Sequence, residues 1–493
     1  MNLFFLSPEV WPFARVGGLA EVSHDLPRTL AARGHRVQVV TLKGRMAPEV
    51  AETLEPTGIT LEVPISWHKY QAQVFKGDLG AGAEVYLIQH DRLYDREGIY
   101  GNAFGDYEDN CERFVFFSRA CLELAAALGR PVDMVHANDW TNALVPVYLK
   151  TLYAEVEPLA GAASLMTVHN LARQGSFWHY DMPLLGLGWE CFTPETLELY
   201  GKINFLKGGL IFADLISTVS PSYAREMLLP EIGAELQGVL QARRDRLVAV
   251  LNGIDNAVWD PATDPHLAAH FSAEDLAGKA VCQRDLREIF GLARDSRRPL
   301  VAVIGRLEDR KGLELIVAGL EDMVAMGLDL VIMGYGGDHY HNVLKAAAEA
   351  NPGRAAVRIG HDMALDHKIM AGADLLLMPS RFEPCGLHQM HAMRYGTVPV
   401  VRATGGLNDT VRDHLPDSPG MGFKFQDFTT PAMLEALDRA LETFGQGEQW
   451  QGLIKRCMWV DFSWQGAAAR YEELYQRAIE LRRGPGGEGL LCR

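Results

Sequence analysis

Two positively charged side chains follow an apolar run in the second half of the chain. Arg306 comes directly after the run VAVIG, and Lys311 follows where the next helix is expected to begin. Parallel sheets bind ligands at the carboxyl ends of their strands, so both cations would be well placed to contact an anion. A departing diphosphate needs charge stabilisation of this kind. The alternative is a helix start with solvated charges, and this segment alone does not exclude it.

A carboxylate follows a second apolar run, DLLLM, in the string PSRFEPCGL. Glu383 lies in this loop, while Gly386 and Leu387 can offer backbone N–H groups at the start of the next helix. A carboxylate there can hold sugar hydroxyls or stabilise positive charge on a sugar ring. A helix cap is the alternative for a loop glutamate, but the unusual Glu-Pro-Cys-Gly string favours a functional role.

A glycine pair, Gly17 and Gly18, follows the first apolar run, with Arg15 beside it. Paired glycines at a strand-to-helix turn let backbone N–H groups approach an anion at a helix N-terminus. A tight turn with a solvated arginine is supported equally well, because a lone glycine pair is a weak signal.

A histidine and an asparagine, His169 and Asn170, end another apolar run. Side chains at the carboxyl end of a strand are well placed to contact a ligand. A structural histidine is the alternative, and it is the more common role of a lone histidine.

Short apolar runs alternate with amphipathic stretches in two successive sets, which predicts two parallel α/β sheets covered on both faces. The break between the sets is expected near Arg243–Asn252, where the charged run ARRDR precedes VAVLNGID. A cleft between two such domains would be a favoured ligand site. The predicted strands are Leu3–Leu6, Val37–Thr41, Val85–Ile88, Met134–His136, Leu165–Val168, Leu215–Thr218, Leu300–Ile304, Leu328–Met333, Ala356–Ile359, Leu375–Met378 and Val398–Val401.

Composition supports a globular protein without a polyanionic partner. The chain has 493 residues, 48% of them hydrophobic and 22% charged, and a formal net charge of −16. Such a surface repels phosphate backbones, so no nucleic-acid partner is expected. The N-terminus lacks a basic region and a long apolar run, and no run is long enough to span a membrane, so neither a signal peptide nor a membrane partner is expected.

Cysteine usage favours a reducing compartment. The seven cysteines are odd in number and scattered, and no C-x-x-C occurs. We therefore expect unpaired thiols and a cytoplasmic protein.

Several other active-site classes lack their motifs. There is no P-loop string, no G-x-G-x-x-G after the first apolar run and no H-E-x-x-H, which argues against an ATPase, a Rossmann dehydrogenase and a zinc protease. His361, His388 and His391 could bind a metal together, but we interpret their grouping as incidental. No metal and no cofactor are expected.

Taken together, these strings resemble the bacterial glycogen synthase and plant starch synthase family. The resemblance runs from SPEVWPFARVGGLAEV to the helix near residue 480 and includes VHANDW, TVHNLA, LNGIDNAVWDPATDP, GRLEDRKGLELI, SRFEPCGL and YGTVPVVRATGGLNDTV. So many specific strings in one order do not agree by chance.

The resemblance implies a fold of the α/β class and GT-B type, with two Rossmann-like, doubly wound parallel-sheet domains and a deep cleft between them. It implies an acceptor-side domain at residues 1–248, a nucleotide-sugar domain at 249–462, a helix at 463–483 that crosses back to the first domain, and a loose tail at 484–493. The family transfers glucose from a nucleotide sugar, usually ADP-glucose in bacteria, to the non-reducing 4-hydroxyl of an α-1,4-glucan such as glycogen. It retains configuration and needs no metal.

The resemblance also implies roles for individual residues. Arg306 and Lys311 match the pair that binds the donor diphosphate, Glu383 lies near the transferred glucose, and His169 contacts that glucose. The full set comprises the catalytic positions His169, Glu383, Arg306 and Lys311, the donor-binding positions Arg15, Gly17, Gly18, Asn252, Cys385, Gly386, Leu387 and His388, and the other cleft positions Glu9, Asp139, Asn170 and His361.

Some positions depart from the family pattern around the donor. Arg15 stands where lysine is usual, His361 where bacterial members often have a tyrosine near the nucleobase, and His388 where threonine is common. Arginine and lysine are not interchangeable at phosphate sites. The choice between ADP-glucose and UDP-glucose therefore stays open, and so does a homologue that binds glucan or nucleotide sugar without turnover. A different GT-B transferase, such as a phosphorylase or a sucrose-forming enzyme, is a third option. A phosphorylase would need a cofactor-bearing lysine, and no segment supports one.

Overall fold

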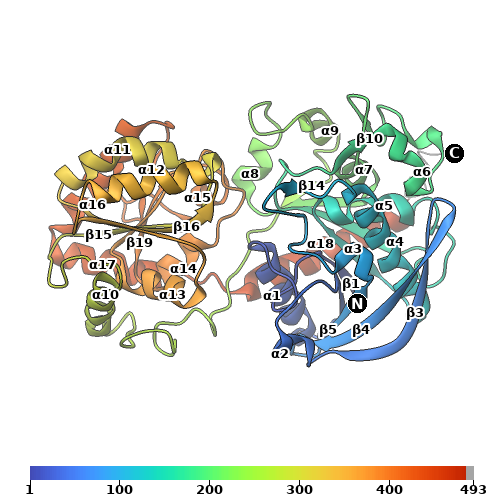
Figure 1. The fold of residues 1–493 in the computed structure, drawn as a ribbon, viewed down its shortest axis with the longest axis horizontal. Coiled ribbons are helices and arrows are strands. Elements are labelled where there is room, and N and C mark those ends of the chain that lie inside the picture. The colour runs from blue at the N-terminus through green and yellow to red at the C-terminus, as the bar shows by residue number, and fades with distance from the viewer. Residues whose placement is uncertain (485–493) are drawn as a thin grey trace. The chain divides into compact units, whose positions relative to one another are not determined.

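Chain contacts divide the protein into two units. The computed structural model describes residues 1–484, so nearly all of the tail predicted at 484–493 lies outside the described residues. Unit 1 comprises residues 1–219, 224–252 and the segment from Trp464 onward, and unit 2 comprises residues 220–223 and 253–463 (Figure 1).

Unit 1 is built on a nine-stranded sheet in the order β14-β13-β9-β8-β1-β2-β5-β4-β3. All of its neighbouring strands from β14 to β5 pair in parallel, which confirms the predicted parallel arrangement for this part of the sheet. The strands are β1 (Asn2–Leu6), β2 (Arg36–Leu42), β3 (Glu55–Ile65), β4 (His68–Asp78), β5 (Glu84–Gln89), β8 (Met134–Asn138), β9 (Ala163–Val168), β13 (Leu215–Thr218) and β14 (Leu247–Ala249).

The strand order of unit 1 reverses at β1. The chain leaves β1 for β2 on one side and later returns to place β8 on the other side of β1. Crevices outside the carboxyl ends of the strands at such a reversal are where open α/β sheets bind ligands. The loop after β1 carries the glycine pair, and the residue after β8 is Asp139.

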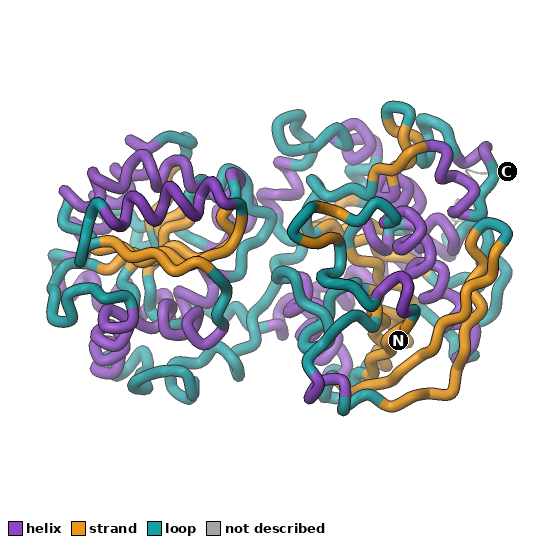
Figure 2. Tube along the Cα trace, in the orientation of Figure 1, coloured by secondary structure: helices purple, strands orange, loops and turns teal. Residues whose placement is uncertain are grey.

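A long antiparallel hairpin, β3 and β4, extends the edge of this sheet and was not predicted (Figure 2). The two strands alternate buried and exposed residues and contain few apolar runs. Their period-two pattern is typical of a sheet with one solvated face, whereas the predictions relied on continuous apolar runs. The expectation of a purely parallel sheet is therefore wrong at this edge.

Ten helices of the described residues cover the unit 1 sheet or connect its strands, and helix α8 crosses the boundary between the units. They are α1 (Leu19–Ala32), α2 (Pro48–Ala51), α3 (Asp91–Tyr94), α4 (Asn110–Leu128), α5 (Leu144–Leu149), α6 (Met182–Leu185), α7 (Phe205–Phe212), α8 (Pro221–Glu226), α9 (Gln237–Ala242) and α18 (Trp464–Arg483). Two small sheets lie in the connections: β6 (Gly101–Asn102) with β7 (Gly105–Asp106), and β10 (Ser176–Trp178), β12 (Lys202–Asn204) and β11 (Glu198–Leu199) in that order.

Helix α18 packs into the core of unit 1. Its buried residues Trp464, Ala468, Tyr471 and Tyr475 recur at helical spacing and belong to the same apolar cluster as β1 and β2. A stripe at this spacing is what an amphipathic helix buries. The Tyr475 hydroxyl also bonds to Nδ1 of the buried His136 on β8, at 2.8 Å.

Unit 2 is built on a six-stranded, wholly parallel sheet in the order β17-β16-β15-β18-β19-β20. Its strand order reverses between β15 and β18, so the segments that follow these two strands meet at one edge. The strands are β15 (Leu300–Leu307), β16 (Asp329–Gly336), β17 (Ala355–Ile359), β18 (Leu375–Met378), β19 (Val398–Arg402) and β20 (Phe423–Phe425).

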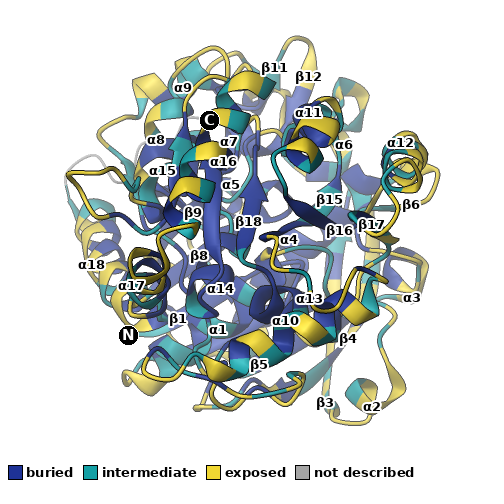
Figure 3. Ribbon diagram, turned by 90° about the vertical axis from the view of Figure 1, so that its left-hand side faces the viewer, coloured by how far each residue is buried: buried dark blue, intermediate teal, exposed yellow. Residues whose placement is uncertain are grey.

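Helices cover both faces of the unit 2 sheet, as predicted for a doubly wound domain. Figure 1 shows α11 and α12 on one face and α10, α13 and α17 on the other. The helices are α10 (Ala277–Ile289), α11 (Leu313–Ala325), α12 (Asp338–Glu349), α13 (Met363–Gly372), α14 (His388–Arg394), α15 (Gly405–Thr410), α16 (Thr430–Phe444) and α17 (Gly447–Met458). Central strands of both units, among them β8, β9 and β18, are buried throughout (Figure 3).

Among the cysteines of residues 1–484, one departs from the expected unpaired state. Cys191 forms a disulfide bond, whereas Cys111, Cys121, Cys282 and Cys457 are buried free thiols. The expectation was wrong for Cys191 because scattered positions along the chain say little about which sulfurs meet in the fold. No helix among residues 1–484 is long and apolar enough to cross a membrane.

Candidate functional site

An ion pair between Lys311 and Glu383 lies at the strand-order reversal of unit 2. The Lys311 ammonium donates to Oε2 of Glu383, and the Ser380 hydroxyl donates to the same oxygen at 3.1 Å. Arg310 places a nitrogen 4.0 Å from Oε1 of Glu383. The carboxylate is therefore surrounded by two cations and a hydroxyl.

Gly312 brings the two halves of this pair together. Its φ of 71° lies in the left-handed region that favours glycine, and a Cβ there would come within 2.0 Å of the Pro379 carbonyl oxygen. The segment that ends in Lys311 can therefore pack directly on the start of the loop that carries Glu383.

The backbone of Glu383 is held from the other side by Gly405 and Gly406. The Gly406 N–H donates to the Glu383 carbonyl at 3.0 Å, and a Cβ on Gly405 would come within 2.0 Å of that oxygen. Cys385 is also buried here, and its carbonyl accepts a hydrogen bond from Gln389 at 3.1 Å. The predicted donor-loop residues Gly386, Leu387 and His388 follow at the start of α14.

Glu383 is ionised in this setting. Burial would raise the pKa of its carboxyl, but the charges of Lys311 and Arg310, together with hydrogen bonds from Lys311 and Ser380, lower the pKa below its usual value. A buried charge is stable only when it is paired and hydrogen-bonded in this way. The cluster can therefore present positive charge and a fixed carboxylate within the same small region.

Arg306 and His361 also lie at the carboxyl edge of this sheet. Arg306 pairs with Tyr335 of β16 in the strand register, and the Tyr335 ring lies 5.9 Å from the ring of His361. The His361 side chain is partly exposed, and its Nδ1 lies 3.7 Å from Oδ2 of Asp366. The carboxyl edge of the sheet therefore carries a further cation and the rings of Tyr335 and His361, in addition to the Lys311–Glu383 pair.

In unit 1 the glycine loop is held by a buried carboxylate. Oε2 of Glu9 accepts the backbone N–H groups of Val16 and Gly17, both at 2.7 Å. Arg15 bonds to Glu21 of helix α1 at 3.0 Å, and Gly18 is the residue before that helix. The Gly17 amide is thus committed to Glu9, which fixes the position of the loop.

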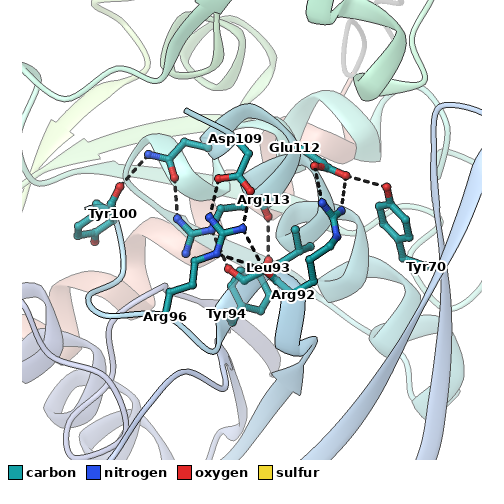
Figure 4. A network of polar contacts seen from close by, with 10 residues as sticks. Tyr70, Arg92, Leu93, Tyr94, Arg96, Tyr100, Asp109, Glu112 and Arg113 are labelled. Atoms are coloured by element: carbon teal, nitrogen blue, oxygen red, sulfur yellow. Dashed lines mark hydrogen bonds and ion pairs between the residues drawn. The ribbon is translucent and has the colours of Figure 1, made fainter. Parts of the chain in front are cut away.

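The other oxygen of Glu9 accepts the Tyr100 hydroxyl at 2.6 Å. Asn110 donates to the Tyr100 carbonyl at 2.8 Å and accepts from Arg113 at 2.6 Å. Figure 4 shows the part of this network around Tyr100 and Arg113, where Arg96 and Asp109 form a further ion pair. The glycine loop is therefore braced by residues about 100 positions further along the chain.

Replacing Glu9 by alanine is expected to destabilise the protein by about 1–3 kcal/mol, because the Val16 and Gly17 amides lose their acceptor. The expected fall in thermal midpoint is a few degrees. Glu9→Gln keeps one acceptor oxygen and should recover part of the loss. Differential scanning calorimetry would compare the two variants, and equal midpoints for both would contradict this assignment.

Asp139 and His169 meet at the carboxyl ends of β8 and β9. Oδ1 of Asp139 accepts the His169 N–H at 2.7 Å and the Asn170 N–H at 3.4 Å. Asp139 itself has a φ of 54°, a strained value for a residue with a side chain. The pKa of Asp139 is raised to about 7, mainly by burial and to a smaller extent by the nearby Glu9 charge, against the lowering effect of these two hydrogen bonds.

The tautomer of His169 follows from its neighbour Asn138. The Asn138 amide nitrogen donates to the Leu6 carbonyl at 2.9 Å, which turns its oxygen toward Nε2 of His169, also at 2.9 Å. Nε2 must therefore carry the proton. Burial lowers the pKa of His169 to about 4, so the ring is neutral at pH 7, with Nδ1 as its acceptor.

The raised pKa of Asp139 predicts a pH-dependent stability. The pKa of Asp139 is about 7 in the folded state and ordinarily 3.8, so the folded state binds the proton more tightly than the unfolded state. The free energy of unfolding of the wild type therefore falls as the pH rises from 3.8 to about 7. Asp139→Asn does not titrate there. Its stability relative to the wild type should therefore rise by up to about 1.4 kcal/mol for each pH unit from 4 to 7. Urea unfolding at pH 5 and 7 checks this, and a constant difference would contradict it.

The structure gathers most of the sequence-predicted residues into one group in each unit. Glu9, Gly17, Asp139, His169 and Asn170 form the unit 1 group. Lys311 and Glu383 form the centre of the unit 2 group, with Arg306, Cys385, Gly386, Leu387 and His388 on the adjoining segments. Among residues 1–484, no hydrogen bond links Asn252 to either group. The buried Oδ1 of its side chain has no hydrogen-bond partner among these residues.

Sequence reasoning missed four residues that hold these groups: Arg310, Ser380, Asn138 and Tyr100. Arg310 stands beside Lys311 and could have been found from charge alone. Tyr100 carries no local signal, since its partner Glu9 is 91 residues away. Among residues 1–484 there is no group of three or more metal-ligating side chains, and the rings of His388 and His391 are 6.3 Å apart.

Two known families match the chain. Residues 2–242 match the family described as starch synthase catalytic domain, and residues 286–449 match the family described as glycosyl transferases group 1. The first match lies in unit 1 apart from residues 220–223, and the second match lies within unit 2.

Individual relatives match over nearly the whole length. A glycogen synthase from Anaeromyxobacter sp. (strain Fw109-5) is 46% identical over 480 residues, covering 97% of this chain and 99% of that protein. One from Anaeromyxobacter dehalogenans (strain 2CP-1 / ATCC BAA-258) is 45% identical over 481 residues, with coverage of 97% and 99%. The catalytic domain of starch synthase IV from Arabidopsis thaliana, solved with ADP and acarbose, has a TM-score of 0.90 and 34% identity, covering 97% of this chain and 99% of that chain.

Proposed function

The chain belongs to the starch synthase and glycogen synthase family of glycosyltransferases, and we propose that it transfers glucose from ADP-glucose to an α-1,4-glucan such as glycogen. The glucose joins the 4-hydroxyl at the non-reducing end, with retention of configuration. The observation that carries the proposal is the Lys311–Glu383 pair at the strand-order reversal of unit 2. A related starch synthase has been solved with ADP and acarbose, which supports a nucleotide donor and a glucan acceptor.

In this proposal, Arg306 and Lys311 bind the donor diphosphate. Arg306 lies at the end of β15, Lys311 follows that strand, and Arg310 adds a third positive charge beside Lys311. The backbone N–H groups at the start of α14, from Gly386 to His388, and the side chain of Arg15 also bind the phosphates. Gly17 and Gly18 shape the loop that carries Arg15, because the Gly17 N–H already donates to Glu9. Fixed donors aimed at developing charge stabilise a leaving group without reorganisation.

Glu383 and His169 are assigned to the transferred glucose. The ionised Glu383 can hold a sugar hydroxyl and stabilise positive charge on the ring, while Lys311 prevents it from acting as a proton donor. The neutral His169 can accept a hydrogen bond at Nδ1. Asp139 and Asn170 lie beside His169 and are assigned supporting roles.

The reaction balances without a protein nucleophile. The bond from the glucose C1 to the diphosphate oxygen breaks, and a bond from C1 to the acceptor O4 forms on the same face. The O4 proton passes to the departing diphosphate, so the products are ADP and a glucan longer by one glucose. Arg306 and Lys311 stabilise the charge that develops on the diphosphate.

Donor choice is tested by competition. Purified protein is incubated with glycogen and equal concentrations of ADP-glucose and UDP-glucose, each carrying a different label. Preferential incorporation from ADP-glucose is the expected result. Preferential incorporation from UDP-glucose would overturn the donor assignment but keep the transfer reaction, whereas binding of both donors without incorporation would favour a homologue without turnover.

A further inference from the structure

A chain of hydrogen-bonded side chains crosses the interior of unit 1. The Tyr475 hydroxyl of α18 lies 2.8 Å from Nδ1 of His136 on β8, and Nε2 of His136 lies 2.6 Å from the Thr167 hydroxyl oxygen on β9. The Thr167 hydroxyl bonds in turn to the Ser217 hydroxyl on β13, also at 2.6 Å. All four residues are at most 1% exposed. We call these four residues the buried polar chain.

The buried polar chain uses both nitrogens of one imidazole ring. Burial and, to a smaller extent, the nearby His169 hold the pKa of His136 well below its usual value, so the ring is neutral. A neutral imidazole has one N–H donor and one acceptor nitrogen, so one of its two hydroxyl partners must donate and the other must accept. Loss of the Tyr475 hydroxyl would therefore leave a buried ring nitrogen unpaired.

Two side-chain contacts join the carboxyl ends of β8 and β9. His136 bonds to Thr167, and two residues further along each segment Oδ1 of Asn138 lies 2.9 Å from Nε2 of His169. The parallel register sets Asn138 opposite Thr167, so both contacts link the same two segments. The Thr167 carbonyl also accepts the N–H of Asp139 at 2.9 Å. The placement of the His169 ring therefore depends on the contact that precedes it along the strands.

Stability alone does not account for polar side chains at these positions. Apolar side chains of similar shape would avoid the cost of removing hydroxyl and imidazole groups from water, and such replacements can be nearly neutral. Hydrogen bonds differ from apolar contacts because they are directional, and a fully satisfied buried network holds its members in one arrangement. The buried polar chain is therefore suited to holding a neighbouring group in place.

We propose that Tyr475 is a positioning residue for His169: through His136 and Thr167 it fixes the end of β9, and with it the histidine assigned to the transferred glucose. The inference rests on the proposed function, which gives His169 its role in the reaction. Tyr475 reaches the glucose only through His169, so helix α18 contributes to the reaction without contacting the substrate.

Loss of the Tyr475 hydroxyl should affect turnover and leave donor binding unchanged. The donor diphosphate is assigned to Arg306 and Lys311, which belong to unit 2, so the KM for the donor should stay at its wild-type value. His169 is assigned to the reacting glucose, where a misplacement of about 1 Å can cost about 10²-fold in rate. For the smaller displacement in Tyr475→Phe, we expect kcat to fall about tenfold.

The test compares Tyr475→Phe with Tyr148→Phe. Tyr148 is a buried residue of α5 whose hydroxyl donates to the Leu185 carbonyl at 3.0 Å, so each variant loses one buried hydroxyl contact. Among residues 1–484, no hydrogen bond or ring contact links Tyr148 to His136 or His169. Steady-state kinetics give kcat and the donor KM, and calorimetry gives the thermal midpoints.

Nuclear magnetic resonance of isotope-labelled histidine rings reports on His169 without turnover, and His169→Asn identifies its signals. We expect similar thermal midpoints for the two tyrosine variants, with a lowered kcat and shifted His169 signals in Tyr475→Phe alone. Equal losses of kcat in both variants would overturn the inference, because lost stability would then explain them. A fall in kcat without a shift of the His169 signals, or a shift without a fall, would also overturn it.

Thr167→Val removes the next hydroxyl of the buried polar chain and keeps the shape of the side chain. If Tyr475 acts through this link, Tyr475→Phe should have little further effect on kcat in the Thr167→Val background. Additive losses would contradict the inferred route. Thr167→Val also repeats the comparison with Tyr148→Phe if Tyr475→Phe does not fold.

This design separates the inference from the proposed function. Shifted His169 signals in Tyr475→Phe of a protein that transfers no glucose would overturn the reaction but keep the link from Tyr475 to His169. Transfer at wild-type rates by Tyr475→Phe would keep the reaction and overturn the inference.

Discussion

Replacing Glu383 by glutamine is expected to lower kcat by about 10²–10³-fold, the cost of removing one preorganised electrostatic group from an active site. Glutamine has nearly the same shape and keeps an acceptor for Ser380, but it cannot balance positive charge on the glucose ring. The protein should stay folded, because Gly405 and Gly406 hold the backbone of residue 383 independently of its side chain.

The matched control for this variant is Glu314→Gln. Glu314 pairs with Arg381 at 2.6 Å, close to the same loop, but the Arg381 side chain is 55% exposed and that of Glu314 is 36% exposed. Exposed pairs contribute little, so its kcat should match the wild type. Full activity of Glu383→Gln in a steady-state transfer assay would remove Glu383 from the reaction.

Replacing Lys311 by alanine is expected to lower kcat/KM for the donor by at least about 10²-fold. Two effects add: the diphosphate loses a cation, and the buried Glu383 carboxylate loses its main partner. Affinity for ADP, measured by calorimetry, should fall as well.

The ADP measurement distinguishes the roles of the two residues. Lys311→Ala should weaken ADP binding, whereas Glu383→Gln should leave it unchanged or strengthen it, because a negative charge near the diphosphate is removed. Lys368→Ala is the control, since Lys368 pairs with Asp285 of α10 and makes no described contact with Lys311 or Glu383. Unchanged ADP affinity in Lys311→Ala would contradict its assignment to the diphosphate.

Apolar runs were sufficient to predict most of the parallel strands, because strands covered on both faces must be apolar along their length. The three-residue strands β14 and β20 were not predicted. The runs before Arg306 and Glu383 became β15 and β18, and the reversal between these strands brought Lys311 and Glu383 together. The hairpin β3–β4 escaped prediction because only one face of each strand is buried.

Contacts between distant segments could not be predicted from the sequence. Glu9 meets Tyr100 across 91 residues, and nothing around either residue indicates the other. The strained backbone of Asp139 and the pKa of its carboxyl arise from the meeting of β8 with β9, which depends on the whole sheet. The sequence indicated a role for the glycine pair Gly17 and Gly18, but it gave no sign that Gly312 packs against the Pro379 carbonyl. That close approach is visible only in the folded structure.

The most direct test of the proposed function is the transfer of labelled glucose from ADP-glucose to glycogen by the purified chain. We expect label in the polymer, one ADP released for each glucose incorporated, and release of that label by an enzyme specific for α-1,4 bonds at non-reducing ends. No incorporation from either ADP-glucose or UDP-glucose, by protein that is folded, would contradict it.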